Sequence, residues 1–164
     1  MVTNGAGGLV GDLSFVSGSD KQLLVFNFLA WMDEIASVSA HRHCRRVVVT
    51  ASVNHVSFNK PIDHADLVTI ESKVSRSFTS SMEVFLDVYV ESNITGEREK
   101  CNEAIYTFVA VDQHGSPIQV PTLVPETELE KSRFEGALRR KQLSLILAGK
   151  MDPSDASELN ALFS

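Results

Sequence analysis

Asp33 is the residue whose type and surroundings point most directly to chemistry. It lies in the segment Trp31–Glu34, inside a largely apolar stretch with helical spacing. Apolar surroundings tend to raise the pKa of a carboxyl group, and such a group can act as a general base or as a nucleophile. The alternative is that Asp33 shares an exposed stripe with Glu34 and takes no part in chemistry. The pattern leaves both interpretations open.

Two other groups have side chains that suit ligand binding. Ser80 and Ser81 precede an alternating strand, where hydroxyl groups can hydrogen-bond the amides of a ligand, although such residues also serve as simple turn residues. Arg139, Arg140 and Lys141 form a cationic cluster on a predicted C-terminal helix. Arginine binds phosphates through paired hydrogen bonds, and the alternative for this cluster is a solvated helix face.

The His41-x-His43-Cys44 segment contains ligand types that zinc accepts. At this spacing on a helix, however, the three side chains do not converge on one ion. We interpret the segment, with its neighbouring arginines, as a basic helix end that the helix dipole favours. The sequence contains neither the nucleophile elbow of serine hydrolases nor a phosphate-binding glycine loop. We therefore predict no metal and no cofactor.

The composition predicts one globular domain. The chain has 164 residues, of which 43% are hydrophobic and 22% charged, and its net charge is -6. This acidic balance disfavours binding to nucleic acid or to membranes. No apolar stretch is long enough to span a bilayer, and the N-terminus lacks the pattern of a signal peptide. The two cysteines are too few for a disulfide framework and fit a reducing compartment, so we expect a cytoplasmic protein.

The elements that must position these residues occur in a helix-then-sheet order. We predict a flexible, glycine-rich lead-in over residues 1–21, a short strand over residues 22–26 and a mostly apolar helix over residues 27–43. From Val47 onward the hydrophobic period changes to two, which is typical of half-buried strands. The alternation predicts antiparallel strands over residues 47–58, 68–75, 82–91 and 105–111.

A second helix is predicted after Pro125. Thr127 and Glu130 have the spacing of a capping box, and the helix is expected to run to about Leu147. Residues 22–148 are thus predicted to form the main domain and residues 149–164 a short tail. A helix followed by antiparallel strands is an α+β plan. Because so small a sheet leaves a free edge, and edge pairing between two copies is a common remedy, we predict a homodimer.

Several segments together resemble the hotdog-fold acyl-CoA thioesterases of the cytosolic acyl-CoA hydrolase type. They follow one another in the order of that family across residues 28–142, and the combination is more specific than any one of them. The segments are Trp31–Ala36, Val49–Val53, Phe58–Ile62, Ser80–Val84, Glu103–Ala110, Val120–Pro121 and Val124–Lys131.

The resemblance implies a long central helix wrapped by a curved antiparallel sheet, with a C-terminal helix, in a homodimer or a trimer of dimers. It implies hydrolysis of fatty acyl-CoA to a fatty acid and CoA, with Asp33 activating water or attacking the thioester. The residues that it places against CoA are Ala51, Ser52, Val53, Ser80, Ser81, Met82 and Arg140, the last at the CoA phosphates. A hotdog hydratase or dehydratase is disfavoured, because the helix has no matching active-site histidine.

One segment departs from the family pattern. Before the aspartate the family usually carries Asn or Asp and then a glycine-rich loop, whose amides can approach the thioester oxygen. Here Leu24–Phe26 occupy the glycine positions, Gly18 lies near the polar position, and the usual first strand has no evident counterpart. We therefore predict that the acyl-CoA-binding framework is retained while the catalytic loop is altered. The alternative function is a weakly active or non-catalytic acyl-CoA-binding subunit that assembles with an active partner.

Overall fold

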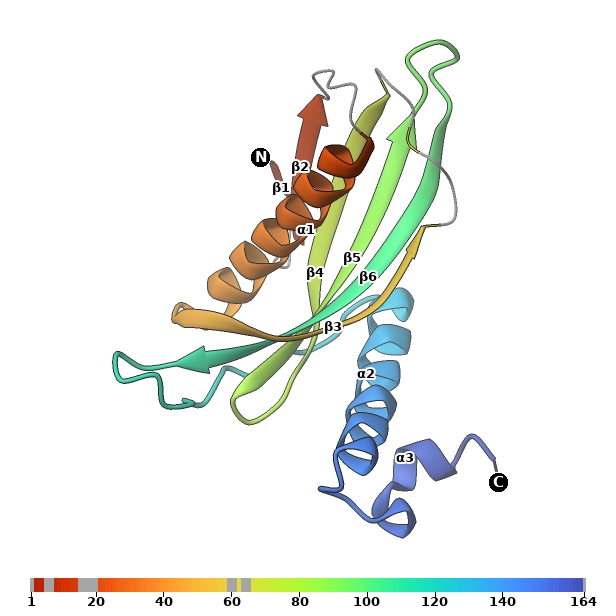
Figure 1. The fold of residues 1–164 in the computed structure, drawn as a ribbon. Coiled ribbons are helices and arrows are strands. Elements are labelled where there is room, and N and C mark those ends of the chain that lie inside the picture. The colour runs from red at the N-terminus through yellow and green to blue at the C-terminus, as the bar shows by residue number, and fades with distance from the viewer. Residues whose placement is uncertain (1, 5–7, 15–20, 59–61, 63–65, 164) are drawn as a thin grey trace. The chain divides into compact units, whose positions relative to one another are not determined.

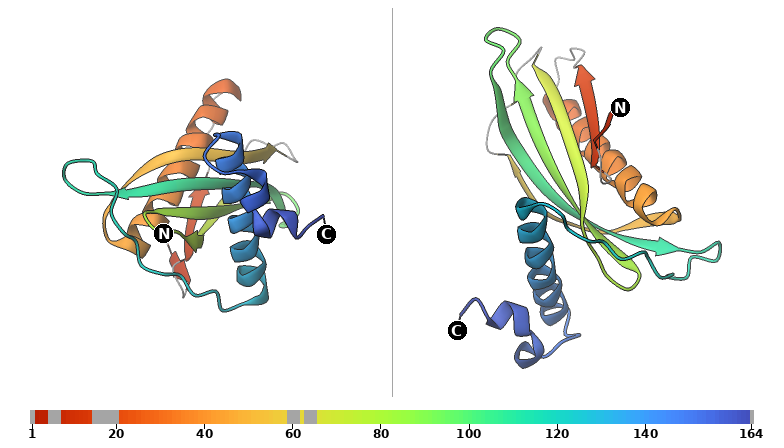
Figure 2. Two further views of the ribbon diagram at one scale, coloured as in Figure 1. Left: turned by 90° about the horizontal axis from the view of Figure 1, so that it is seen from below. Right: turned by 180° about the vertical axis from the view of Figure 1, so that it is seen from behind.

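The computed structural model describes residues 2–4, 8–14, 21–58, 62 and 66–163. The chain divides into two compact units, Met1–Thr122 and Leu123–Ser164. Within the first unit, one helix lies against one face of an antiparallel sheet (Figures 1 and 2). The elements of this unit are β1 (Val2–Asn4), β2 (Gly8–Ser14), α1 (Lys21–Cys44), β3 (Val47–Phe58), β4 (Leu67–Ser77), β5 (Ser81–Glu91) and β6 (Arg98–Val111).

The six strands form one sheet in the order β1-β2-β4-β5-β6-β3. In the described part of the sheet, all neighbouring strands pair in the antiparallel direction. β6 lies between β5 and β3, as its two largely apolar faces predict. β3 is the edge strand next to β6, because the chain crosses from α1 to the far side of the sheet before it returns through β4. The long strands curve around α1, so the predicted central helix and wrapped sheet are confirmed (Figure 1).

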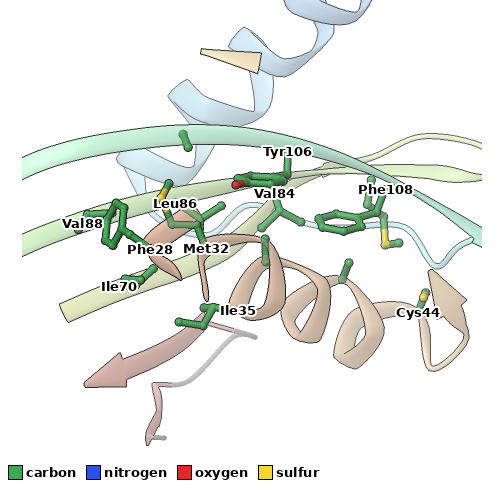
Figure 3. Packing of buried hydrophobic residues seen from close by; sticks show 14 of the residues in the cluster. Phe28, Met32, Ile35, Cys44, Ile70, Val84, Leu86, Val88, Tyr106 and Phe108 are labelled. Carbon is green, nitrogen blue, oxygen red and sulfur yellow. The ribbon is translucent and has the colours of Figure 1, made fainter. Parts of the chain in front are cut away.

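α1 forms because its apolar residues recur every three or four positions and face the sheet. Phe28, Met32, Ile35 and Ala36 of this helix are buried, and Figure 3 shows the labelled side chains among them pointing toward Leu86 and other core residues of the strands. A buried methionine of this kind typically contributes a few kcal/mol, so Met32→Ala would cost about 2–5 kcal/mol. The core between α1 and the sheet is thus closely filled.

A small polar contact also fixes α1 on β4. The Ser39 and Ser72 hydroxyl oxygens lie 2.5 Å apart, and the Ser72 hydroxyl donates to the Ile35 carbonyl at 3.2 Å. Both serines are buried. Buried hydroxyl groups are costly without partners, so these bonds set the position of the helix along the strand.

Two predictions for the N-terminal part are wrong. Residues 22–26 are not a strand but the first turns of α1, since a short continuous apolar run has no period that separates strand from helix. The expected lead-in contains strands β1 and β2, and β2 pairs with β4 from Leu9↔Ser72 to Ser14↔Leu67. Glycine disfavours strand interiors, but the backbone partners that β4 offers outweigh this local preference. Gly18 and the rest of residues 15–20 lie outside the described residues.

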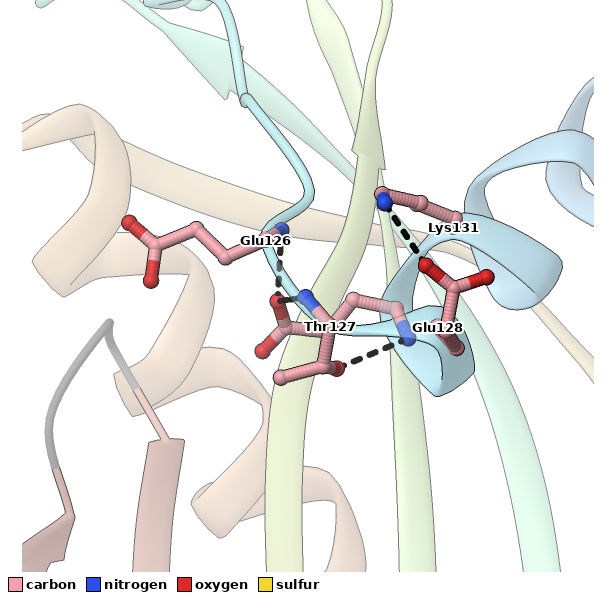
Figure 4. A network of polar contacts seen from close by, with 5 residues as sticks. Glu126, Thr127, Glu128 and Lys131 are labelled. Atoms are coloured by element: carbon pink, nitrogen blue, oxygen red, sulfur yellow. Dashed lines mark hydrogen bonds and ion pairs between the residues drawn. The ribbon is translucent and has the colours of Figure 1, made fainter.

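The second unit contains α2 (Glu128–Leu147), the 3-10 helix η1 (Pro153–Asp155) and α3 (Ser157–Asn160). The predicted capping box is present: the Glu130 amide donates to Thr127 Oγ1 at 3.2 Å, and the Thr127 amide donates to Glu130 Oε2 at 3.1 Å (Figure 4). Gly149 follows the helix with φ +67°, a conformation that glycine adopts without strain. The predicted start and end of this helix are confirmed.

Candidate active site

Asp33 faces the edge strand of the sheet. Its Oδ1 accepts a hydrogen bond of 3.1 Å from Thr50 Oγ1 on β3, and the carboxylate is partly exposed. The interpretation of Asp33 as a member of a solvated stripe is therefore incomplete, because this carboxylate has a specific partner on another element. Glu34, the next residue, is exposed. The contact leaves the second carboxylate oxygen of Asp33 available to a substrate or to water.

A β-bulge lies beside this contact. Thr50 pairs with Phe108 and Ser52 with Thr107, so Ala51 is the extra residue in β3. Bulges often occur next to active sites, where they redirect side chains. Here the bulge lets Thr50 face the helix while the following residues change direction along the strand. The irregularity falls within the Ala51–Val53 segment for which the sequence predicts contacts with CoA.

Tyr106 is the buried group next to Asp33. It lies on β6, is only 2% exposed and stacks on Phe108 with a centroid distance of 6.1 Å. Burial and, secondarily, the negative charge of Asp33 raise the pKa of Tyr106 to about 12. The phenol therefore stays neutral near pH 7, and Figure 3 shows its ring among the core side chains, beside Val84.

The predicted CoA-contacting residues fall into two groups in the first unit. Ala51 is exposed, Ser52 is half-buried and Val53 is exposed, so the β3 segment can be reached by a ligand. Ser80 is half-buried, whereas Ser81 and Met82 are buried. The Met82 side chain is part of the hydrophobic core, so a contact from this residue would have to come from its backbone.

The pairing register of β3, β6 and β5 shows where the Ala51–Val53 segment and the serines of β5 lie relative to one another. Ser81 pairs with Val109, and Val109 pairs with Val49 on β3. The serines at the start of β5 therefore lie at the level of Val49, one strand away from β3. The structure brings them to the same end of the sheet, and their contact with CoA stays a prediction.

Arg140 lies in the second unit, on α2. Its guanidinium group folds back over Gly136 and donates to the Arg133 carbonyl at 3.4 Å. A Cβ atom at Gly136 would lie 2.9 Å from a guanidinium nitrogen, so glycine makes room for this arrangement. The role of Arg140 at the CoA phosphates stays a prediction.

The rings of His41 and His43 each form a hydrogen bond with a backbone carbonyl oxygen. A ring nitrogen of His41 lies 2.8 Å from the Arg46 carbonyl oxygen, and one of His43 lies 2.9 Å from the Pro121 carbonyl oxygen. Among the described residues, no three His, Cys, Asp or Glu side chains are grouped as metal ligands. No helix in that part of the chain is both long enough and apolar enough to cross a membrane.

Thr50 and Tyr106 are the site residues that sequence reasoning missed. In the sequence, Thr50 is one residue of the Val49–Val53 motif and Tyr106 is one residue of a predicted central strand. No local signal marks Tyr106, and none identifies Asp33 as the partner of Thr50, because that contact depends on how β3 lies against α1. The run of apolar residues around Thr50 was the one available hint, since a hydroxyl group there needs a partner when it faces a helix.

The start of α1 lies far from this site within one chain. Asp33 follows Lys21, the first helical residue, by twelve positions, which is about 18 Å along the helix axis. The free amides at the helix N-terminus are thus too distant to bind a thioester oxygen held at Asp33 of the same chain. Leu24–Phe26, at the family's glycine positions, are helical.

A long helix wrapped by a curved antiparallel sheet defines the hotdog class of proteins. The thioesterase superfamily model matches residues 27–97. In the crystal structure of an apo-hexameric acyl-CoA thioesterase, the fold matches with a TM-score of 0.82 and 33% identity, over 87% of this chain and 94% of that one. The chain therefore belongs to the acyl-CoA thioesterase family within this superfamily, which confirms the resemblance seen in the sequence.

Two further relatives and one complex extend the comparison. An uncharacterised acyl-CoA thioester hydrolase of Bacillus subtilis is 50% identical over 112 residues, 68% of this chain and 65% of that protein. The cytosolic acyl coenzyme A thioester hydrolase of Rattus norvegicus is 37% identical over 127 residues, 74% of this chain and 33% of that protein. The chain thus spans less than two thirds of the length of either relative. An acyl-CoA hydrolase from Staphylococcus aureus, in complex with butyryl-CoA and CoA, matches with a TM-score of 0.74 and 28% identity, over 88% of this chain and 92% of that one.

Proposed function

We propose that this protein hydrolyses fatty acyl-CoA to a fatty acid and CoA, with Asp33 as the general base or nucleophile. The observation that carries the proposal is the contact of Asp33 with Thr50, which gives the carboxylate a fixed position at an accessible edge of the sheet. Relatives named as acyl-CoA thioester hydrolases support the substrate class. We also propose a cytoplasmic location and a part in lipid metabolism, supported by the cytosolic rat relative.

The chemistry requires few groups. In the general-base route, Asp33 takes a proton from a water molecule as the water oxygen attacks the thioester carbonyl. The tetrahedral intermediate then breaks its carbon–sulfur bond, and the CoA thiolate leaves and takes up a proton. In the nucleophilic route, the carboxylate attacks the carbonyl, the carbon–sulfur bond breaks and the CoA thiolate leaves and takes up a proton. Water then hydrolyses the resulting anhydride to the fatty acid and the free Asp33 carboxylate. In both routes Thr50 holds one carboxylate oxygen and leaves the other free to react.

The Staphylococcus aureus relative supports this pair. Its structures include variants with alanine in place of an aspartate, of a threonine 17 positions later and of an asparagine 15 positions earlier. Asp33 and Thr50 are also 17 positions apart. The position 15 residues before Asp33 is Gly18, which has no side chain with which to bind an oxygen. This difference supports the prediction of an altered catalytic loop.

We also propose that the protein acts as a homodimer or a trimer of dimers. The hexameric state of a relative supports this assembly. In the described part of the chain β3 pairs only with β6, and Val47, Val49 and Val53 on it are 64%, 48% and 48% exposed. A second copy that covers this edge would bury these side chains and supply backbone partners.

The test compares acyl-CoA turnover by the wild type, Asp33→Asn and Glu34→Gln over several acyl-chain lengths. We expect Asp33→Asn to lose about 10²–10⁴ in kcat, because it removes the proton acceptor, and the neighbouring exposed Glu34→Gln to retain the wild-type rate. Turnover that is unaffected by Asp33→Asn would refute the mechanism.

A second candidate function is an acyl-CoA-binding subunit with little activity of its own. The observation that favours it is the helical Leu24–Phe26 segment at the family's glycine-loop position. Loss of one oxyanion donor typically costs about 10²–10³ in rate. Binding of CoA by the wild type without turnover at any acyl-chain length would support this function over the first.

A further inference from the structure

The turn between α1 and β3 presents three arginines. α1 ends at Cys44 and β3 begins at Val47, so Arg45 and Arg46 form the whole connection, and Arg42 lies one turn earlier on the helix. All three side chains are exposed. Among the described residues, no carboxylate lies within ion-pair distance of any of them. This concentration of positive charge is unusual in a chain whose net charge is -6.

The turn is held in one conformation by several backbone contacts. The Arg45 amide donates to the His41 carbonyl at 2.7 Å, which is the hydrogen bond of a left-handed helix cap. The His41 ring contacts the Arg46 carbonyl oxygen at 2.8 Å, and the Cys44 thiol donates to the same oxygen at 3.7 Å. The two arginine side chains therefore extend from a fixed backbone.

Arg45 occupies a position that favours glycine. Its φ is 54°, and it is the one non-glycine residue with positive φ in the described part of the chain. The left-handed conformation disfavours side chains with a Cβ atom, and non-glycine residues kept there often have a functional reason. The helix dipole accounts for positive charge near a helix end, but not for arginine in place of glycine at this position.

The turn lies at a definite distance from the candidate catalytic pair. Cys44 follows Asp33 by eleven positions of α1, about 16 Å along the axis. Thr50 follows Arg46 by four positions, about 13 Å of extended chain. The Asp33–Thr50 contact joins α1 to β3 at the candidate catalytic pair, and the His41–Arg46 contact closes the turn between the two elements. Arg46 directly precedes Val47, the first residue of β3, so the turn leads straight into the strand that carries Thr50.

This distance matches the chemistry of CoA. From sulfur to the first phosphorus, the pantetheine arm has a chain length equivalent to roughly four peptide units, so it extends to about 15 Å. A thioester held at Asp33 and Thr50 would thus place the CoA phosphates near Arg45 and Arg46. Arginine suits this contact, because its planar guanidinium group donates two hydrogen bonds to one phosphate.

We propose that the Arg45–Arg46 turn, assisted by Arg42, binds the phosphate groups of CoA. This inference rests on the proposed acyl-CoA substrate. It gives a binding role to residues that the sequence pattern indicated only as a basic helix end. It makes the turn a determinant of affinity for the CoA end of the substrate. The acyl group and the chemical step are not affected by it.

The experiment measures binding of CoA and of pantetheine by calorimetry, so that it does not depend on turnover. The variants are Arg45→Gly, Arg46→Gln and the double variant Arg45→Gly/Arg46→Gln. Arg45→Gly removes the charge and also relieves the left-handed strain, so its melting temperature should equal or exceed that of the wild type. Arg98→Gln is the matched control, because it removes one positive charge from an arginine already paired with Glu71 at 2.9 Å.

We expect each single variant to raise the Kd for CoA about fivefold to tenfold and the double variant by more, with the Kd for pantetheine unchanged. The Kd for CoA should also rise with salt in the wild type and do so less steeply in the double variant. Arg98→Gln should bind CoA as the wild type does.

Three results would overturn the inference: unchanged CoA binding by the double variant, an equal loss for CoA and pantetheine, or an equal loss in Arg98→Gln. A wild type that binds CoA through the turn but does not hydrolyse acyl-CoA would refute the proposed function and leave this inference standing. A wild type that binds no CoA would refute both.

Discussion

Thr50 on β3 donates a hydrogen bond of 3.1 Å to Asp33 on α1, across 17 residues of sequence. The bond joins the edge strand to the central helix at the point where β3 has its bulge. The Asp33 carboxylate is therefore held by β3, a strand that pairs with only one neighbour, β6, in the described sheet. Any assembly that reinforces β3 would also hold Asp33 more firmly.

Replacing Thr50 by valine should reduce turnover while the fold is kept. Valine has nearly the same shape but no hydroxyl group, so Asp33 loses a hydrogen bond to a charged acceptor, worth about 1.5–3 kcal/mol. We expect kcat for acyl-CoA to fall about tenfold to a hundredfold, with a smaller change in KM. Thr50→Ser keeps the hydroxyl group and should retain most of the activity. Equal rates for Thr50→Val and the wild type would contradict the positioning role.

The titration of Tyr106 should report the charge of Asp33. Burial, followed by the Asp33 charge, raises the pKa of this phenol to about 12. The phenolate absorbs at longer ultraviolet wavelengths than the phenol, so a spectrophotometric titration should show one tyrosine that ionises well above the usual pH of about 10. Asp33→Asn should lower that pKa, because it removes one of the two causes. An unchanged titration in this variant would show that the two groups do not interact.

The same shift predicts how stability depends on alkaline pH. Between pH 10 and 12 the unfolded chain loses the Tyr106 proton while the folded chain keeps it, so the free energy of unfolding falls as the pH rises. The loss is at most about 2–3 kcal/mol, from a shift of two units at 1.36 kcal/mol each. Urea denaturation from pH 8 upward should show this decline in the wild type. Tyr106→Phe should lack this contribution, whereas Tyr89→Phe should retain it.

Much of the fold could be predicted because each main strand has its own periodic signal. The alternation from Met82 to Val90 predicts β5, and the two apolar faces around Phe108 predict the central place of β6. The capping box at Thr127 predicts the start of α2. Each of these signals is local, so it needs no knowledge of the rest of the chain.

The remainder depends on contacts between distant segments. Gly8 and Gly11 lie in β2 because β4 supplies backbone partners, which glycine-rich sequence does not reveal. Leu24–Phe26 continue a helix because the turns after them are helical, although the run alone also fits a strand. Asp33 could be chosen from its apolar surroundings, but Thr50 could not, since only the path of β3 past α1 brings the two together.

Lys100 on β6 should contribute more to stability than an exposed lysine with a similar ion pair. Its amine contacts Asp87 at 2.6 Å and Glu103 at 2.7 Å, and the Asp87 side chain is only 10% exposed. Burial lowers the pKa of Lys100, but the hydrogen bonds to Asp87 and Glu103 outweigh it and raise the pKa overall. This stabilisation is therefore present below the unfolded pKa of about 10.5 and is lost as the pH rises through the folded value.

We expect Lys100→Met to lower the free energy of unfolding by about 1–2 kcal/mol at pH 7, since Asp87, in a largely buried place, loses its contact with Lys100. Lys131→Met is the control, because the Lys131–Glu128 pair has side chains that are 51% and 91% exposed and should contribute little. Urea denaturation followed by circular dichroism gives both values. Equal effects of the two substitutions would contradict the importance of the Asp87 environment.

Asn102 on β6 should be a site where an apolar residue stabilises the fold. It is 1% exposed, and neither polar atom of its side chain has a hydrogen-bond partner among the described residues. It pairs with Val88, a core residue of β5. An amide left without partners in such a place costs about 1–3 kcal/mol, whereas leucine has the same branching and the same number of side-chain heavy atoms, none of them polar. We expect Asn102→Leu to raise the free energy of unfolding, measured in urea, and Asn93→Leu in the exposed turn after β5 to leave it unchanged. A clear loss of stability in Asn102→Leu would show that the amide is used in the folded protein, and a further loss of CoA affinity in that variant would place this use at the ligand.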